Sequence, residues 1–364
     1  MALSKIDVAN MLTGLVPNDN TIRRPNANAL IINGDLAVAQ RTTSTSSVSS
    51  GSNFVSDRFT FGPSTAGTWT ISQEAITSGS PFDDGFRTAF KADNTTANGS
   101  LSGGSNLQFA QKIEAQDLQV LKYGSSTGTN VIEIFGHDSS RSVSVAYTVS
   151  TTNTWEKKTV SIPADTGGTI NNDNGTGLEV IWWLVAGSNF TSGSLQTSWA
   201  ANSATARAVG QVNHADSTSN NVHIAGVQLE VGEYTSATIP PFLNESFGDN
   251  LHRCCRYFFY TGGGAAYQSH GTGVDTTTTA AYLNIPLPNI LRSSPSITKE
   301  DSLVIWDGNS ESAITSLGNI YYSARGSLVN VSVVASGGGV DDAAGIIVYS
   351  NADGSSGFLI SAEL

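Results

Sequence analysis

Apolar and polar residues alternate along most of the chain between Leu30 and Phe242. The clearest case is residues 143–149, VSVAYTV, where valine and tyrosine alternate with small or polar residues. A period of two sends successive side chains to opposite faces of a strand, so one face is buried and the other meets water. This stretch predicts a half-buried β-strand, and similar stretches predict that the whole region is all-β.

Residues 178–186, LEVIWWLVA, are apolar at nearly every position. A strand that is apolar on both faces is typical of a sheet centre covered on both sides. We therefore expect a central strand with Trp182 and Trp183 in the core. Turn-forming clusters separate the predicted strands at 44–52, 94–104, 123–130, 163–177 and 215–221. The number and spacing of the strands indicate a two-sheet β-sandwich of the jelly-roll type.

The next pattern reads as strand, turn, short helix and strand. In residues 226–232, GVQLEVG, three apolar residues alternate with small or polar ones and predict a strand. After two prolines, Asn244 is the expected N-cap of a helix that places Phe247, Leu251 and Cys254 on one face. We expect this linking helix within residues 244–256.

A second β-rich unit follows the glycines at 262–264 and continues to Leu364. Its candidate strands are 283–287, 303–306, 320–322, 328–334, 346–349 and 358–360. The predicted fold class is therefore all-β, with a jelly-roll β-sandwich at 29–243 and a smaller C-terminal β-sandwich at 257–364. A unit of about 100 residues can hold a small core of its own.

Residues 1–28 carry a short apolar pattern that allows two or three helical turns, too few to be stable alone. We expect this segment to attach to another protein; a partly ordered tail is the alternative. The residues expected to make the attachment are Ile6, Met11, Leu12 and Leu15.

Composition and charge narrow the possible partners. Only 13% of the 364 residues are charged, about half the usual share, which suits short strands joined by small polar turns. The net charge of −12 argues against a nucleic-acid partner, because phosphate binding depends on clustered lysine and arginine. No run reaches the 18 or so apolar residues of a membrane span, and the first residues do not resemble a secretory signal. We expect neither membrane insertion nor export.

Residues that could carry catalysis are scattered. Glycan hydrolysis needs two carboxylates roughly 5 to 9.5 Å apart, and no spacing brings together any two of Asp83, Asp84, Glu114, Glu133, Glu179 and Glu230. The histidines lie outside zinc and nucleophile motifs. We therefore expect no enzyme activity, cofactor or metal. A calcium site at Asp165 and 171–174 is the alternative to a solvated turn there. The adjacent Cys254 and Cys255 are expected to be free thiols.

Aromatic residues beside polar turns are the candidates for ligand binding. The C–H faces of sugars stack on aromatic rings, while nearby polar side chains hold the hydroxyl groups. The candidate glycan-binding residues are Trp69, Tyr123, Trp155 and Trp199. The alternative for the tryptophans is a place in the core of the sandwich, which needs large side chains.

Several short motifs occur in one order between residues 29 and 260. They are ALIINGD at 29–35, QR at 40–41, DRF at 57–59, QKIE at 111–114, TWEKKTVSIP at 154–163, GVQLEVG at 226–232 and PFLNESFGDNLHRCCRYFFY at 241–260. The series resembles a module of tailed-bacteriophage virion proteins, especially tail-fibre and related structural proteins of marine phages. SPSIT at 294–298 and SAEL at 361–364 resemble the C-terminal unit of these proteins. The chain departs from the module at 130–144, where VIEIF replaces a common strand sequence.

The resemblance implies a structural virion protein, a tail-fibre, spike or other exterior appendage subunit assembled in the host cytoplasm. It also implies a jelly roll like that of carbohydrate-binding modules. Other virion structural proteins are the expected partners, together with further copies of the chain in a trimer by analogy with phage fibres. Host-surface polysaccharide is the candidate ligand. The alternatives are a capsid-decorating knob or fibre without a receptor role and a glycan-degrading enzyme.

Overall fold

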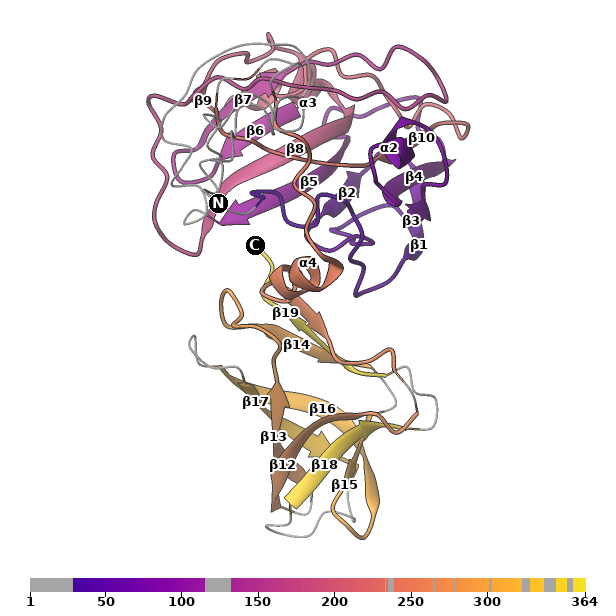
Figure 1. The fold of residues 1–364 in the computed structure, drawn as a ribbon, viewed down its shortest axis with the longest axis vertical. Helices are drawn as coiled ribbons and strands as arrows, with labels where there is room; N and C mark the ends of the chain where they lie inside the picture. Colours follow the sequence, from indigo (N-terminus) through magenta and orange to yellow (C-terminus); the bar gives the residue numbers. More distant parts are fainter. Residues whose placement is uncertain are drawn as a thin grey trace, which may run out of the picture.

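The protein consists of two β units joined end to end with a short helix between them (Figure 1). This computed structural model describes residues 29–364 except 115–131, 233, 235–238, 265, 278, 301–302, 323–327, 337–344 and 352–355. The expected attachment residues Ile6, Met11, Leu12 and Leu15 and the candidate Tyr123 lie outside the described residues.

The prediction of an all-β protein is confirmed, because the helices of the described part are few and short. They are α2 (Ser80–Asp83), α3 (Ser188–Thr191), the 3-10 helix η2 (Ala204–Ala206) and α4 (Phe247–Cys254). Within the described residues, none of them has the length and apolar character needed to cross a membrane.

The N-terminal unit is a sandwich of two antiparallel sheets. The first sheet has the strand order β1 (Ser44–Val48), β3 (Thr68–Ala75), β4 (Thr88–Thr96), β10 (Asn221–Ile224). The second has the order β2 (Thr60–Ser64), β5 (Asn106–Glu114), β8 (Thr176–Ala186), β6 (Ile132–Gly136), β7 (Arg141–Val145), β9 (Ala200–Ala201). The chain passes repeatedly from one sheet to the other, as in jelly-roll sandwiches. The predicted two-sheet sandwich is therefore confirmed.

Aromatic rings fill the core between the two sheets. Phe109 on β5 stacks on Phe90 of β4 and on Phe59, with ring centroids 4.4 Å and 4.9 Å apart. Phe61 meets Trp69 edge to face at 5.8 Å. Rings of this size each bury about 150–250 Å² and pack in defined orientations. These contacts therefore fix how the two sheets face each other.

The strand β8 is buried on both faces, as its composition predicted. Trp182 belongs to the core between the sheets, whereas Trp183 packs on the other side of its sheet beneath residues 187–212. Trp183 Nε1 donates to Glu133 Oε2 at 2.9 Å, and Arg207 Nε donates to Oε1 of the same carboxylate at 2.8 Å. Desolvation raises the pKa of Glu133, although both donors oppose it. This group of bonds anchors the covering segment to the sheet.

One predicted strand ends early and another does not form. β7 ends at Val145, short of residue 149, and its outer neighbour β9 offers only two residues for pairing. β10 ends at Ile224, and the strand predicted at 226–232 is not formed. Gly226 has a φ of +61°, a left-handed conformation that breaks the ladder at this point.

The linking helix α4 lies inside the predicted range, but its cap and buried face differ from the prediction. Ser246, not Asn244, is the N-cap: Asp249 N donates to Ser246 Oγ at 3.1 Å. Phe247 is 60% exposed, while Asn250 and Cys254 are buried. The helix buries the polar Asn250 because its side chain forms hydrogen bonds with Asn33 and Asp35 of the sandwich.

The C-terminal unit contains a closed six-stranded barrel and a three-stranded sheet. The barrel order is β12 (Ser269–Thr277), β13 (Ala280–Pro286), β17 (Leu328–Ala335), β16 (Glu311–Tyr322), β15 (Leu303–Trp306), β18 (Gly345–Ser350). The sheet order is β11 (Phe258–Tyr260), β19 (Phe358–Ser361), β14 (Ser296–Lys299). The sheet lies between the barrel and α4 (Figure 1).

Aliphatic side chains fill the barrel, as the alternation in its strands predicted; Leu283, Val331 and Val348 are fully buried. We expected this unit to be a small β-sandwich; in the structure six of its strands close into a barrel and three form a separate sheet. Gly273 on β12 approaches β13 so closely that a Cβ atom would lie 2.0 Å from Tyr282 O. Such a close approach of two backbones requires glycine.

Candidate functional site

Six of the nine motifs that carry the family resemblance meet where the sandwich contacts α4 and the C-terminal unit (Figure 1). They are the motifs at 29–35, 40–41, 57–59, 111–114, 241–260 and 361–364. We call this contact the junction. It is formed by residues 29–41, 57–59, 111–114, 250–258 and 361–364, together with Asn174 and Arg292. Segments that are more than 300 residues apart in the chain meet here. The motifs therefore specify one three-dimensional contact.

Asn33 closes a tight turn at the edge of the junction. Its φ is +59°, a conformation that asparagine tolerates better than most residues. Its Nδ2 donates to Val38 O and Asp57 O, both at 2.9 Å, and its Oδ1 accepts from Val38 N. Asn33 N donates to Asn250 Oδ1 at 3.0 Å. The turn is thus bonded directly to α4.

Gly34 brings two of the motifs together. Val227 N donates to Gly34 O at 2.8 Å. A Cβ atom on Gly34 would lie 2.1 Å from Val227 O, so a larger residue would push the two segments apart. The motif at 29–35 and the motif at 226–232 are therefore packed backbone to backbone.

Two glutamine side chains form hydrogen bonds with backbone groups of other segments. The buried Gln111 donates to Ile32 O at 2.8 Å and accepts from Ile32 N at 2.9 Å. Gln40 Nε2 donates to Phe258 O at 2.9 Å, and Gln40 N donates to Asp57 Oδ1 at 3.0 Å. An unbonded buried amide would be costly, so these bonds fix the register between the segments.

Two arginines of the sandwich hold one carboxylate of the C-terminal segment. Arg58 and Arg41 both pair with Glu363, the second at 3.2 Å. The Arg58 guanidinium lies 3.4 Å from the ring centroid of Tyr257, and that of Arg41 lies 3.5 Å from the ring centroid of Phe258. The Arg58 side chain is only 2% exposed. Its charge is thus desolvated and depends on these partners, a setting in which a cation–π contact contributes about 2 kcal/mol.

Glu114, at the end of β5, forms a second ion pair across the junction. Arg256 Nε and Nη2 donate to its two carboxylate oxygens at 2.7 and 2.9 Å, a bidentate geometry. Burial alone would raise the pKa of Glu114. Hydrogen bonds from Arg256 and Tyr257 and the charges of Arg256 and Arg292 outweigh burial, so the pKa is lowered.

Arg292 links the C-terminal segment to the sandwich through backbone oxygens. Its Nε and Nη2 donate to Ala362 O and Glu363 O, both at 3.0 Å. Its Nη1 donates to Asn174 O at 2.7 Å, and Asn174 Nδ2 donates back to Arg292 O. Sequence reasoning did not assign a role to Arg292, because no local pattern surrounds it.

Behind the charged groups lies a small apolar cluster that contains Ile32, Val38, Tyr257 and Cys254. Both cysteines are free, as predicted, and buried. Burial raises the pKa of the Cys254 thiol well above its ordinary value, and burial and the nearby Asp57 raise that of Cys255 to about 12. Both groups therefore remain thiols at neutral pH and serve as packing.

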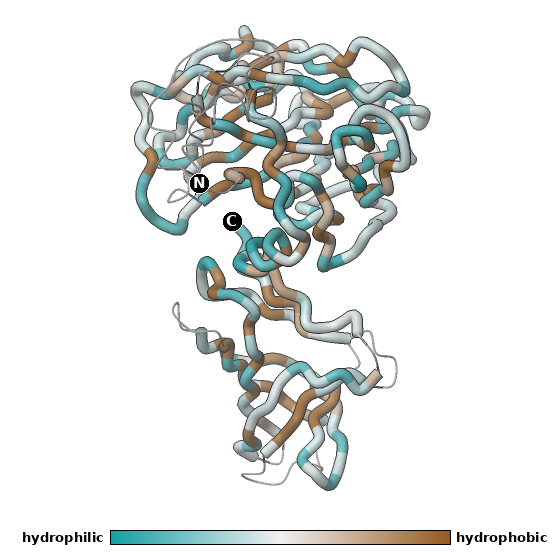
Figure 2. Tube along the Cα trace, viewed as in Figure 1, coloured by the Kyte–Doolittle hydropathy of each residue, from teal (hydrophilic) through white to brown (hydrophobic). Residues whose placement is uncertain are grey.

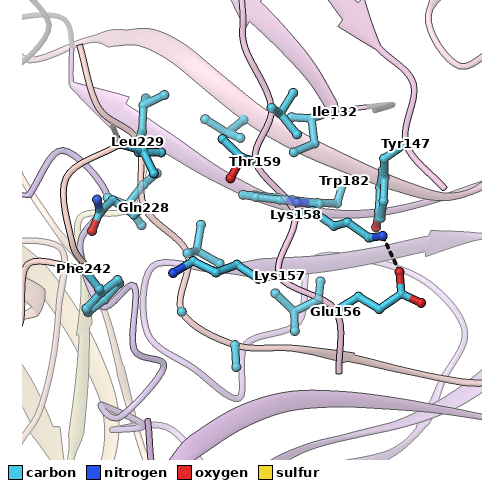
Figure 3. Close-up of a pocket in the computed structure, with 18 of the residues that line it drawn as sticks. Ile132, Tyr147, Glu156, Lys157, Lys158, Thr159, Trp182, Gln228, Leu229 and Phe242 are labelled. Atoms are coloured by element: carbon cyan, nitrogen blue, oxygen red, sulfur yellow. Dashed lines mark hydrogen bonds and ion pairs between the residues drawn. The ribbon is translucent and has the colours of Figure 1, made fainter. Parts of the chain in front are cut away.

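The second candidate site is a cavity of about 1850 Å³ at the side of the sandwich. Figure 3 shows Gln228, Leu229 and Phe242 on one side of it and Tyr147 and Trp182 on the other. The chain that carries Lys157 and Lys158 runs between these two sides.

The cavity arises because the two sheets differ in width. The second sheet has six strands and the first has four, so part of the inner face of β6 and β8 has no strand opposite it. Ile132 and Val180 on that face line the cavity. Residues 146–175, which form no strand, cover this part of the sheet, with Ile162 and Ile170 packed against the core. Because this segment forms no strand, it does not pack against the sheet along its whole length, and the cavity lies between them.

Many residues of the lining are polar or charged, and some of them are held in place by bonds to one another. Lys158 pairs with Glu156, which also accepts from Thr151 N, and the Lys158 bond lowers the pKa of Glu156. His223 Nε2 lies 2.7 Å from Glu74 Oε2. The lining thus combines aromatic rings with many polar groups, and a ligand with both apolar and polar faces, such as a sugar, suits such a lining.

The structure separates the three candidate tryptophans into two groups. Trp69 is fully buried, and its Nε1 donates to Ala66 O at 2.8 Å, so it cannot contact a ligand; its proposed role in glycan binding was wrong. Its side chain faces the core between the two sheets, where it packs against Phe61, and this explains its burial.

Trp155 and Trp199 both line the cavity and are partly exposed. The Trp155 ring lies edge to face with His223, 5.9 Å between centroids. Trp199 Nε1 donates to Pro163 O at 2.5 Å, which ties it to the covering segment. Sequence reasoning missed the polar members of this lining, because segments that it treated as separate strands meet only in the folded chain.

Three of the acids considered for glycan hydrolysis are paired with basic side chains. Glu114 pairs with Arg256, Glu133 with Arg207, and Glu179 with His137. Asp165, considered above for calcium, pairs with Arg141 and accepts from the backbone of 167 and 168. In the part of the chain that the structure describes, no three His, Cys, Asp or Glu residues form a group that could hold a metal ion.

Comparisons with protein-family models, with curated proteins and with solved structures gave no match for this chain. The geometry itself supports two roles. The junction couples the two β units, and the cavity offers an aromatic-lined space for a ligand.

The Glu114 ion pair makes stability depend on pH. A Glu114→Gln substitution is expected to lower the free energy of unfolding by about 2 kcal/mol at pH 7, because Arg256 loses its charged partner. The folded-state pKa of Glu114 lies below the ordinary value of 4.5. Its contribution is therefore complete above that value and is lost as the pH falls through the folded-state pKa. Urea unfolding at neutral and acidic pH measures the difference.

The deficit of the Gln variant should shrink as the pH is lowered below 4.5. The quantity compared is the difference in free energy of unfolding between the Gln variant and the native chain at each pH. Burial also raises the pKa of Asp57 and Glu133, but both proteins contain these acids, so their effect cancels in the difference. Asp83→Asn, at an exposed site on α2, is the control and should have no effect. A Gln variant as stable as the native chain at pH 7 would contradict the argument.

Proposed function

We propose that the protein is a structural component of a tailed-bacteriophage virion, a tail-fibre, spike or other exterior appendage subunit. The observation that carries this proposal is that six of the nine motifs resembling virion proteins lie together in the junction. The sequence likeness therefore concerns a way of joining two β units, and not only isolated strands.

The chemistry of the junction suits a mechanical role. Neighbouring domains usually move relative to each other unless a large or strong interface holds them. Here, the buried Arg58 and the partly buried Arg256 and Arg292 are held by carboxylates, aromatic rings and backbone oxygens on both sides. Removing one partner of a buried ion pair leaves an uncompensated charge at a cost of about 3–5 kcal/mol, so Arg58 and Glu363 do not separate without a penalty. A particle appendage needs such a fixed orientation to present one end outward.

The partners that follow from this role are other virion structural proteins and further copies of the chain. The acidic balance, −12 overall, fits an exterior subunit with no nucleic-acid contact. A capsid-decorating protein could have the same fold. The two roles differ in where the protein lies on the particle: on the tail for an appendage subunit, on the capsid for a decorating protein.

The direct test is to examine purified particles of the phage that encodes the chain. We expect mass spectrometry to detect the protein in density-purified virions and immunogold labelling to place it on tail appendages. Labelling on the capsid shell would favour the decorating role. Absence of the chain from intact particles would overturn the proposal.

We further propose that the cavity binds a surface glycan of the host. Trp155 and Trp199 supply ring faces for stacking, and Lys158 and Glu156 supply groups for hydroxyl or charged substituents. Weak binding at each copy would be amplified where several copies contact one surface.

Trp155→Ala is expected to weaken binding of a monovalent host-surface oligosaccharide at least tenfold, because the stacking face is lost. Calorimetry with oligosaccharides prepared from the host's polysaccharide measures the change. Trp306→Ala is the matched control, since this tryptophan is 41% exposed on the barrel, away from the cavity. Equal affinity of all three proteins would exclude the cavity as the site. Release of reducing ends from the polysaccharide would instead indicate a glycan-degrading enzyme.

A further inference from the structure

The outer wall of the barrel is unusual for a surface in contact with water. The six barrel strands carry no lysine or arginine, and their charged residues are Asp275, which is buried, and Glu311. Exposed surfaces normally carry charge at about a quarter to a third of their positions. Figure 2 shows brown and pale residues along these strands.

Large apolar side chains point outward from the same strands. Of the twelve exposed large hydrophobic residues in the described part of the chain, seven lie on the barrel strands: Val274, Tyr282, Trp306, Tyr321, Leu328, Val334 and Ile347. Single exposed apolar residues are ordinary, but a gathered set marks an interaction surface. We call these seven residues the barrel wall.

Several members of the barrel wall lie opposite one another in the strand pairing. Polar residues lie between others: Ser332 lies opposite Tyr282, and Asn330 and Ser332 separate Leu328 from Val334 on β17. Trp306 on β15 lies opposite Ile347 on β18, and Val274 on β12 lies opposite Tyr282 on β13. The ring of Tyr282 lies 6.1 Å from that of Tyr321 on β16. Because β18 pairs with β12 and β13 with β17, these contacts run around the barrel without a charged interruption other than Glu311.

We propose that the barrel wall is a self-association surface and that its partner is a second copy of this chain. Two copies that each carry a net charge of −12 repel each other wherever their acidic surfaces meet. The barrel wall is where two copies can approach while bringing almost no like charges together. A basic partner would find no carboxylate there except Glu311 to pair with, so the wall is not suited to it.

The shape of the barrel sets an upper limit on the area that one copy can bury. Six strands about 4.8 Å apart and tilted by about 40° form a barrel roughly 24 Å across its side chains. Half of such a wall, over about 20 Å of its height, measures roughly 750 Å². Two convex barrels bury less than this against each other, so the contact is smaller than a standard interface and is of the weak, transient kind. The closed barrel has no free strand edge, so copies associate through side chains and not by adding strands.

The test measures the mass of the full chain by sedimentation across micromolar concentrations. We expect the native chain to associate, and Tyr282→Lys and Ile347→Lys to raise the dissociation constant at least tenfold by placing a cation in the interface. Each lysine makes the net charge less negative, so general repulsion cannot explain dissociation. Val212→Lys is the control, because Val212 is 63% exposed on the sandwich, and should associate like the native chain.

A second readout does not depend on how the lysine variants fold. The native cysteines are buried, so one added surface cysteine reports its own surroundings. Val334→Cys should cross-link to dimers with a short bis-maleimide, while Val212→Cys should not. A native chain that stays monomeric, or cross-linking that is equal at the two positions, would overturn the inference. The virion role is tested separately on particles, and either proposal can fail while the other stands.

Discussion

Ion pairs of the buried Arg58 and the partly buried Arg41 and Arg256 with carboxylates across the junction tie the two β units together. Arg58 is almost fully buried, and Glu363 from the far end of the chain neutralises it. Neither charge could stay in that environment alone, because an unpaired buried charge costs several kcal/mol. The C-terminal segment must therefore return to the sandwich, which closes the chain into one body with two β units.

The other features follow from where each unit lacks a covering layer. In the sandwich, the wider sheet is covered partly by non-strand chain, and this leaves the cavity with Trp155 and Trp199 in its wall. In the barrel, closure buries the inner face and leaves an outer wall with little charge. The junction lies between the cavity of the sandwich and the outer wall of the barrel (Figure 1).

Much of the fold could be predicted from the alternation of side chains. The burial of β8 on both faces followed from its apolar composition, and the all-β class from the period of two. The strand expected at 226–232 did not form, because Gly226 takes a left-handed conformation that residue patterns do not reveal. Barrel closure was also not predictable, since it depends on which strands pair at long range.

The candidate site was less predictable than the fold. Aromatic residues near polar turns gave no way to separate Trp69, which is in the core, from Trp155, which lines the cavity. Their sequence surroundings are alike, and only the packing of the sheets distinguishes them. The junction motifs were recognised as a series, but their contact with Arg292 and Glu363 required the folded chain.

The most direct test of the rigid junction is a distance measurement between the two units. Nitroxide labels on cysteines introduced at the exposed positions Ser100, on the sandwich, and Asn309, on the barrel, can be read by pulsed electron resonance. The account predicts a single narrow distance distribution in the native chain, broadened when Arg58→Ala removes the buried charge. A broad distribution in the native chain would contradict it.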